Sequence, residues 1–125
     1  MTTEPSFAAL AQQTSRNLAP LRSGQPQVMK AFTELGRSAL AEGALSEKMK
    51  ELIALALGVA AHCDACIAFH TRALARLGAT RAEVEETLGV AVYMGGGPSL
   101  MYSANALAAF AEFTAAGTTL PGAPG

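Results

Sequence analysis

Apolar side chains recur every three to four residues along most of the chain, and short stretches with glycine or proline separate these segments. This spacing is that of an α-helix with one apolar face. It is clearest between about Pro26 and Glu42, in the series Val28, Met29, Phe32, Leu35 and Leu40. No stretch shows the apolar–polar alternation of a half-buried strand flanked by turns. The pattern therefore predicts an all-α fold, a compact bundle of about six helices.

Capping residues and breakers set the expected helix boundaries. Ser46 is a good N-cap, the sequence from Thr80 to Glu83 is typical of a capping box, and Gly78 suits a helix C-terminus. The expected helices run from about Pro5 to Asn17, Pro26 to Glu42, Ser46 to Ala61, Asp64 to Leu77, Thr80 to Met94 and Pro98 to Ala116. Pro20 and a loop over 23–26 are expected to separate the first two helices, and residues 117–125 are expected to form a loose tail.

The boundary between the third and fourth helices rests on length, because no glycine–proline break lies between Ser46 and Leu77. A single helix of 32 residues would span about 48 Å, whereas a compact chain of this size has a radius of gyration of about 14 Å. The polar insert His62-Cys63-Asp64 is the best candidate for a corner. Asp64 or a neighbour would then cap the fourth helix and leave Cys66 in its first turn. The stretch from Leu52 to Ala61 is apolar on all sides, which predicts a buried helix.

Composition limits the classes of protein that fit. The 125 residues are half apolar and 15% charged, with a net charge of −1, so one globular domain over 1–125 is expected and a nucleic-acid partner is not. The uncharged stretch from Leu88 to Ala111 is interrupted by Gly95-Gly96-Gly97-Pro98, which predicts two helices and no membrane span. No secretory signal is recognised at the N-terminus, so a reducing cytosol is the expected compartment. So many apolar residues on a small domain favour association with further subunits.

Cys63-Asp-Ala-Cys66 is a C-x-x-C motif, for which a structural disulfide, a metal site and a redox dithiol are the competing interpretations. A structural disulfide would close only a very short loop and contribute about 2 kcal/mol. No second C-x-x-C completes a metal site, and His70 lies about 10 Å along a helix from Cys63. A thiol in the first turn of a helix is favoured as thiolate. The motif therefore favours a cycling redox pair without a metal cofactor.

His70 and Glu51 are the candidate partners of this pair. His70 follows Cys66 by four residues, which places the two on the same helical face. Glu51 directly precedes the apolar run of the third predicted helix; alternatively, it is a solvated member of the Lys48–Lys50–Glu51 charge cluster.

The pattern Glu51, eleven residues, Cys63-x-x-Cys66-x-x-x-His70 resembles the alkyl hydroperoxidase D-like proteins of the carboxymuconolactone decarboxylase superfamily. The similarity covers about Leu45 to Phe113, including the glycine-rich turn that ends at Pro98. Thioredoxin is a poor match because no βαβ pattern surrounds the cysteines.

The resemblance implies a helical enzyme that reduces hydroperoxides with a dithiol or protein reductant and assembles as trimers or hexamers. It implies that Cys66 attacks the peroxide, that Cys63 resolves the product, and that Glu51 and His70 relay protons. Ala65 departs from the founding peroxidase, which has a further relay histidine between its cysteines. Three alternatives remain: a general dithiol–disulfide oxidoreductase, a decarboxylase of a carboxylated lactone, and a redox sensor or assembly module without turnover.

Overall fold

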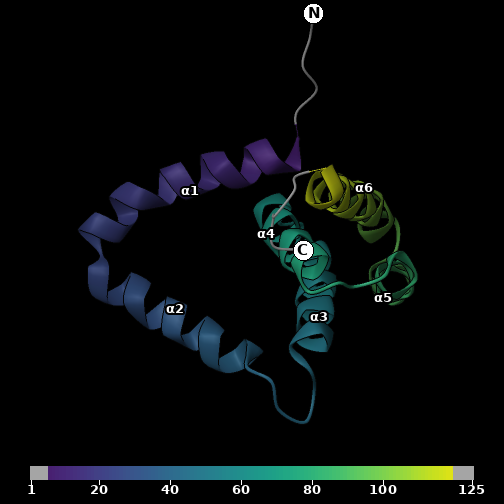
Figure 1. Cartoon of the computed structure of the whole chain (residues 1–125), viewed down its shortest axis with the longest axis horizontal. Coiled ribbons are helices and arrows are strands. Elements are labelled where there is room, and N and C mark those ends of the chain that lie inside the picture. Colours follow the sequence, from purple (N-terminus) through teal and green to yellow (C-terminus); the bar gives the residue numbers. More distant parts are fainter. Residues whose placement is uncertain (1–5, 120–125) are drawn as a thin grey trace, which may run out of the picture.

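The computed structural model describes residues 6–119, and within them the chain is all-α, with six helices and no strand. Figure 1 shows their arrangement: α3 to α6 pack together, while α1 and α2 form an arm that leaves this body and returns to it. The helices are α1 (Phe7–Gly24), α2 (Pro26–Leu40), α3 (Glu47–Ala60), α4 (Asp64–Arg76), α5 (Arg81–Gly95) and α6 (Gly97–Thr119). The predicted all-α fold is confirmed.

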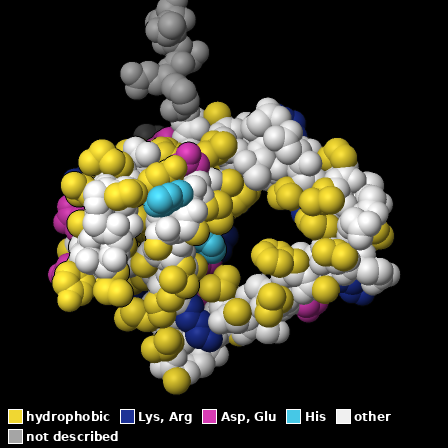
Figure 2. Space-filling view, turned by 180° about the vertical axis from the view of Figure 1, so that it is seen from behind, with side chains coloured by type: hydrophobic (Ala, Val, Ile, Leu, Met, Phe, Trp, Pro, Cys, Tyr) yellow, Lys and Arg dark blue, Asp and Glu magenta, His cyan; other side chains and the backbone are white. Residues whose placement is uncertain are grey.

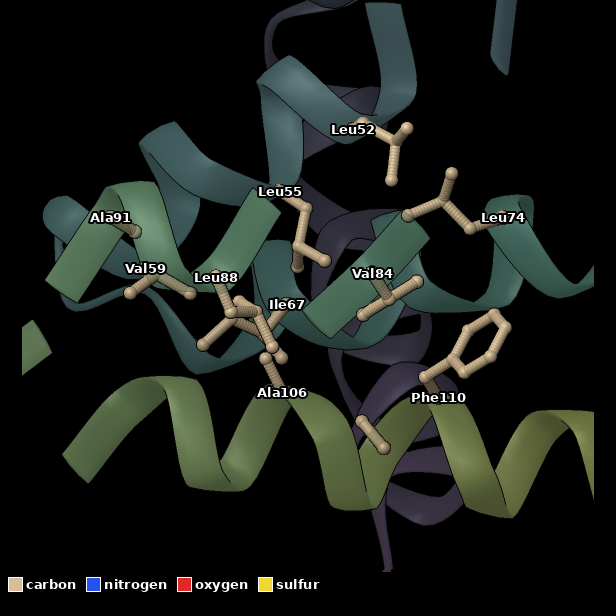
Figure 3. Close-up of a cluster of buried hydrophobic side chains, with 11 residues drawn as sticks. Leu52, Leu55, Val59, Ile67, Leu74, Val84, Leu88, Ala91, Ala106 and Phe110 are labelled. Atoms are coloured by element: carbon tan, nitrogen blue, oxygen red, sulfur yellow. The ribbon is translucent and has the colours of Figure 1, made fainter. Parts of the chain in front are cut away.

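The core lies between α3, α4, α5 and α6, and α4 packs against both α3 and α6 (Figure 3). Leu55 and Val59 of α3, Ile67 of α4 and Val84 of α5 are fully buried there. Each such side chain contributes about 1.5–3 kcal/mol when it leaves water. This shared core fixes α3 relative to α4, the two helices that carry the candidate site residues.

Capping residues begin these helices where the sequence predicts. Ser46 accepts the Met49 N–H through its hydroxyl, and Thr80 and Glu83 form the predicted capping box at the start of α5. Gly78 lies in the turn that ends α4 and has a φ of +77°. Residues with a side chain adopt this left-handed conformation only at a cost in free energy.

The first helix is longer than the sequence predicts. Residues 18–24 are helical, Pro20 lies inside α1, and Gln25 alone separates α1 from α2 in place of the expected loop over 23–26. Proline removes the hydrogen bond to the carbonyl of Arg16, but this part of α1 is exposed and water can hydrate that group. A residue remote in the sequence fixes the start of this helix. The Glu112 carboxylate of α6 accepts hydrogen bonds from the N–H groups of Phe7 and Ala8 at 2.9 and 3.0 Å.

The apolar face of α2 is largely uncovered within the chain. This helix has no buried residue, and Val28, Phe32 and Leu35 are 60, 70 and 63% exposed. Figure 2 shows an opening between the arm and the body, bordered by hydrophobic side chains. The regular apolar spacing of α2 thus predicted the helix but not a place in the core of this chain.

Two further expectations are corrected. The third helix is not buried on all sides, because Ile53 and Leu57 are 44 and 65% exposed on the face turned away from the core. The last helix continues to Thr119, so residues 117–119 of the expected loose tail are helical, and 120–125 lie outside the described residues. Among residues 6–119, none of the helices combines the length and the hydrophobicity that crossing a bilayer requires.

Candidate functional site

The predicted corner between α3 and α4 is present and has the geometry of a Schellman motif. The N–H of His62 donates to the carbonyl of Val59, and the N–H of Cys63 donates to the carbonyl of Gly58, both at 3.0 Å. These two bonds satisfy carbonyls at the end of α3 and turn the chain sharply. His62 occupies the left-handed position of the motif, with a φ of +56°.

Cys63 ends this corner and begins the next helix. It is the N-cap of α4, and its Sγ accepts the N–H of Cys66 at 3.2 Å. Asp64, the first candidate for this role in the sequence, is instead the first helical residue. Cys66 lies in the first turn as predicted, and the two cysteines are joined by a disulfide with their Cα atoms 5.2 Å apart. The pair therefore lies at the positive end of the helix dipole, among N–H groups that favour a thiolate.

A glycine allows α3 to approach this turn. A Cβ placed on Gly58 would lie 3.2 Å from the Cβ of Cys66, which is closer than such contacts usually are. Gly58 is buried in the apolar C-terminal half of α3. Sequence reasoning missed this glycine, although an isolated glycine inside a helical pattern often has a packing reason.

Glu51 and His70 meet between α3 and α4. The Glu51 side chain is buried although it is ionisable, and its Oε1 lies 2.6 Å from Nδ1 of His70. With Glu51 ionised, its carboxylate can only accept a hydrogen bond, so Nδ1 then carries the hydrogen and Nε2 is left to exchange a proton. Glu51 is therefore not a solvated member of the Lys48–Lys50 cluster, which was the alternative.

The four predicted site residues thus form two pairs on adjoining helices. His70 and Cys66 are both partly buried and lie one helical turn apart on α4, about 6 Å along its axis. Ala65 is in the same first turn as Cys66. Within residues 6–119, His, Cys, Asp and Glu side chains form no cluster of three or more that would hold a metal ion.

One contact at the corner was missed by the sequence analysis. The imidazole of His62 stacks on the ring of Tyr102 from α6, with ring centroids 4.7 Å apart and planes within 7°. Sequence reasoning gave no sign of it, because His62 and Tyr102 are forty positions apart in the chain. Their proximity follows from the packing of α4 against α6.

Comparison with known proteins assigns the chain to a family. The sequence model of the carboxymuconolactone decarboxylase family matches residues 26–109. An uncharacterized protein of Cupriavidus necator is 42% identical over 98 residues, covering 78% of this chain and 87% of the relative. Uncharacterized protein 4 in the cox locus of Paracoccus denitrificans is 35% identical over 86 residues, covering 69% and 78%. The crystal structure of apo-lpg0406, a carboxymuconolactone decarboxylase family protein from Legionella pneumophila, has a TM-score of 0.84 and 52% identity, covering 86% of this chain and 96% of that one. The chain belongs to the carboxymuconolactone decarboxylase family.

Proposed function

We propose that this protein is a thiol-dependent peroxidase that reduces organic hydroperoxides to alcohols through the Cys63–Cys66 pair. The observation that carries the proposal is the buried Glu51 carboxylate on Nδ1 of His70, one helical turn from Cys66. Burying a carboxylate is costly unless it is paired. Its position beside a histidine that can exchange protons suits an acid–base group for a thiol reaction.

The proposed oxidation begins with a Cys66 thiolate, whose proton passes to His70. The thiolate attacks one peroxide oxygen, the O–O bond breaks, and the products are a sulfenic acid on Cys66 and an alkoxide. His70 returns the proton to the alkoxide, which leaves as the alcohol, while Glu51 stabilises the charged imidazole. The thiol of Cys63 then condenses with the sulfenic acid, which releases water and forms the disulfide.

A dithiol closes the cycle by reducing this disulfide in two exchange steps. Its two electrons pass to the pair, its two protons end on Cys63 and Cys66, and it leaves as a disulfide. A reducing cytosol, which keeps such thiols reduced, is the compartment that this cycle requires.

The test replaces each cysteine separately and measures consumption of an alkyl hydroperoxide with dithiothreitol as reductant. Cys66→Ser is expected to abolish consumption. Cys63→Ser, reduced beforehand and assayed after the dithiothreitol has been removed, is expected to consume one equivalent and leave a sulfenic acid on Cys66 that dimedone traps for mass spectrometry. A sulfenic acid found on Cys63 would reverse the assignment, and a wild-type rate no faster than free dithiothreitol would reject the proposal.

Two other activities each have one supporting observation. A disulfide at a helix N-terminus also suits a dithiol–disulfide oxidoreductase acting on disulfide substrates, which insulin reduction would reveal. The family's name favours decarboxylation of a carboxylated lactone. That chemistry does not use the thiols, so a Cys63→Ala/Cys66→Ala double variant that keeps decarboxylating would establish it.

We further propose that the protein works as a homo-oligomer, a trimer or hexamer, in which a second copy covers the apolar face of α2. Support comes from the exposure of Phe32 and its neighbours, because a strongly amphipathic helix gains little from a face left in water. Phe32→Ser should reduce the particle mass in sedimentation velocity, whereas Lys30→Ser, on the opposite face of the helix, should not. Equal particle masses for both variants and wild type would place the contact elsewhere.

A further inference from the structure

His62 occupies a position that this same chain elsewhere gives to glycine. The turn after α4 repeats the turn after α3: Gly78 N–H donates to the carbonyl of Ala75, and Ala79 N–H donates to the carbonyl of Leu74. Gly78 and His62 have φ values of +77° and +56°. A glycine adopts this conformation freely, whereas a side chain makes it costly. The corner beside the cysteines therefore keeps an imidazole at a strained position.

The imidazole has one partner that accounts for its presence. It lies flat on Tyr102 at a centroid distance of 4.7 Å, so it links the corner to α6. The next residue is Cys63, whose N–H completes the turn and whose sulfur caps α4. Any rotation at His62 consequently moves the Cys63 sulfur relative to the first turn of α4.

We propose that His62, through its stack on Tyr102, is a positioning residue that holds Cys63 for attack by the thiol reductant. The inference rests on the proposed redox cycle, of which it concerns the reduction half. A reductant thiolate attacks the Cys63 sulfur in line with the disulfide, the S–S bond breaks, and Cys66 leaves as a thiolate.

Access directs the attack to Cys63, because Cys63 lies at the corner between the exposed residues His62 and Asp64, whereas Cys66 lies inside the first turn of α4 against Gly58 of α3. The second thiolate of the reductant then attacks the reductant sulfur bound to Cys63, releases Cys63 as a thiolate that takes up a proton, and leaves as the oxidised dithiol. A fixed corner accelerates the cycle at this first step, because it holds the Cys63 sulfur in line with the attacking thiolate.

The test measures the rate at which dithiothreitol reduces the Cys63–Cys66 disulfide of the folded, oxidised protein, with no peroxide present. His62→Gly keeps the left-handed turn without strain but removes the ring, and Tyr102→Leu removes the other half of the stack. Each is expected to slow reduction about tenfold, well within the hundredfold that a 1 Å displacement of a reacting group can cost. The double variant is expected to be no slower than either single variant, because both changes break one contact.

His62→Phe is the matched control, since it keeps a flat ring and removes the nitrogens. It is expected to retain a rate within about twofold of wild type. Urea unfolding of every variant separates a local change from a loss of fold. A wild-type rate for His62→Gly, effects that multiply in the double variant, or a His62→Phe rate as slow as that of His62→Gly would each overturn the proposal. Because no peroxide enters the assay, an effect of His62 would persist even if the peroxidase activity proved absent.

Discussion

Replacing Glu51 by glutamine tests the acid–base pair most directly. The amide is almost the same size as the carboxylate, and its oxygen can still accept the hydrogen on Nδ1 of His70. The substitution therefore keeps the contact seen at 2.6 Å and removes only the charge that stabilises an imidazolium. We expect a slower peroxide reaction in a protein that folds normally.

The size of the effect follows from the distance and the partial burial of the pair. Two unit charges about 4 Å apart interact by about 4 kcal/mol at an effective dielectric constant of 20. The His70 side chain is 27% exposed, so we reduce this to about 2–3 kcal/mol, which corresponds to a loss of about 30- to 150-fold in rate. The glutamine also brings two N–H donors into a buried place, at a cost of about 1–3 kcal/mol. Relief from burying a charge offsets part of that cost.

The assay is kcat/KM for an alkyl hydroperoxide at saturating dithiothreitol, with urea unfolding of the same preparations. Glu86→Gln, an exposed carboxylate on α5, is the matched control for the loss of one negative charge. A double variant that combines Glu51→Gln with His70→Asn should be no slower than His70→Asn alone, because Glu51 acts through the histidine.

Two results would refute this reasoning. A Glu51→Gln rate within twofold of the Glu86→Gln rate would show that the buried carboxylate is structural. Losses that multiply in the double variant would show that Glu51 and His70 act separately, despite their hydrogen bond.

Two further predictions concern packing and pH. Gly58→Ala should crowd Cys66, which costs about 1–3 kcal/mol of stability. Alanine recovers ~1 kcal/mol because it favours a helix more than glycine does. We therefore expect a slightly lower free energy of unfolding in urea and slower alkylation of Cys66. Gly89→Ala, whose Cβ would meet nothing within 4 Å, should instead stabilise the protein, and equal effects of the two changes would contradict the crowding. The pKa of Glu83 is lowered by its hydrogen bond from Lys48 and by the backbone N–H of its N-cap residue, so its contribution to stability is present at neutral pH and is lost as the pH falls through that lowered pKa. Glu83→Gln, which keeps the capping box, should therefore be less stable than wild type at pH 7 and equal to it once the pH is well below that lowered pKa. A difference that persists in acid would contradict the assignment.

Local rules predicted most of the fold because its boundaries are local. The hydroxyl cap at Ser46, the glycine at position 78 and the polar corner before Cys63 each act within a few residues, and each lies where the sequence places it. Pro20 shows the limit of such rules, since a proline is tolerated inside a helix where the carbonyl that loses its partner is exposed to water. The orientation of α2 depends on surfaces outside the helix, which its own amphipathic pattern does not identify.

The candidate site divides in the same way. The spacing of Cys63, Cys66 and His70 along one helix is a local property and was read from the sequence. The Glu51–His70 contact spans 19 residues, and spacing alone left Glu51 open to an interpretation as surface charge. His62 required the fold itself, because its partner Tyr102 is forty positions further along the chain.

These contacts place the two halves of the proposed cycle on different interfaces of α4. Glu51 and His70 lie where α3 meets α4, beside the cysteine proposed to attack the peroxide. His62 and Tyr102 lie where the corner meets α6, beside the cysteine proposed to receive the reductant. If both assignments hold, Glu51→Gln slows single-turnover oxidation by peroxide and leaves reduction by dithiothreitol near wild type, while His62→Gly does the reverse. Variants that slow both steps equally would mean that the pair responds as one rigid unit, and the separation of roles would have to be abandoned.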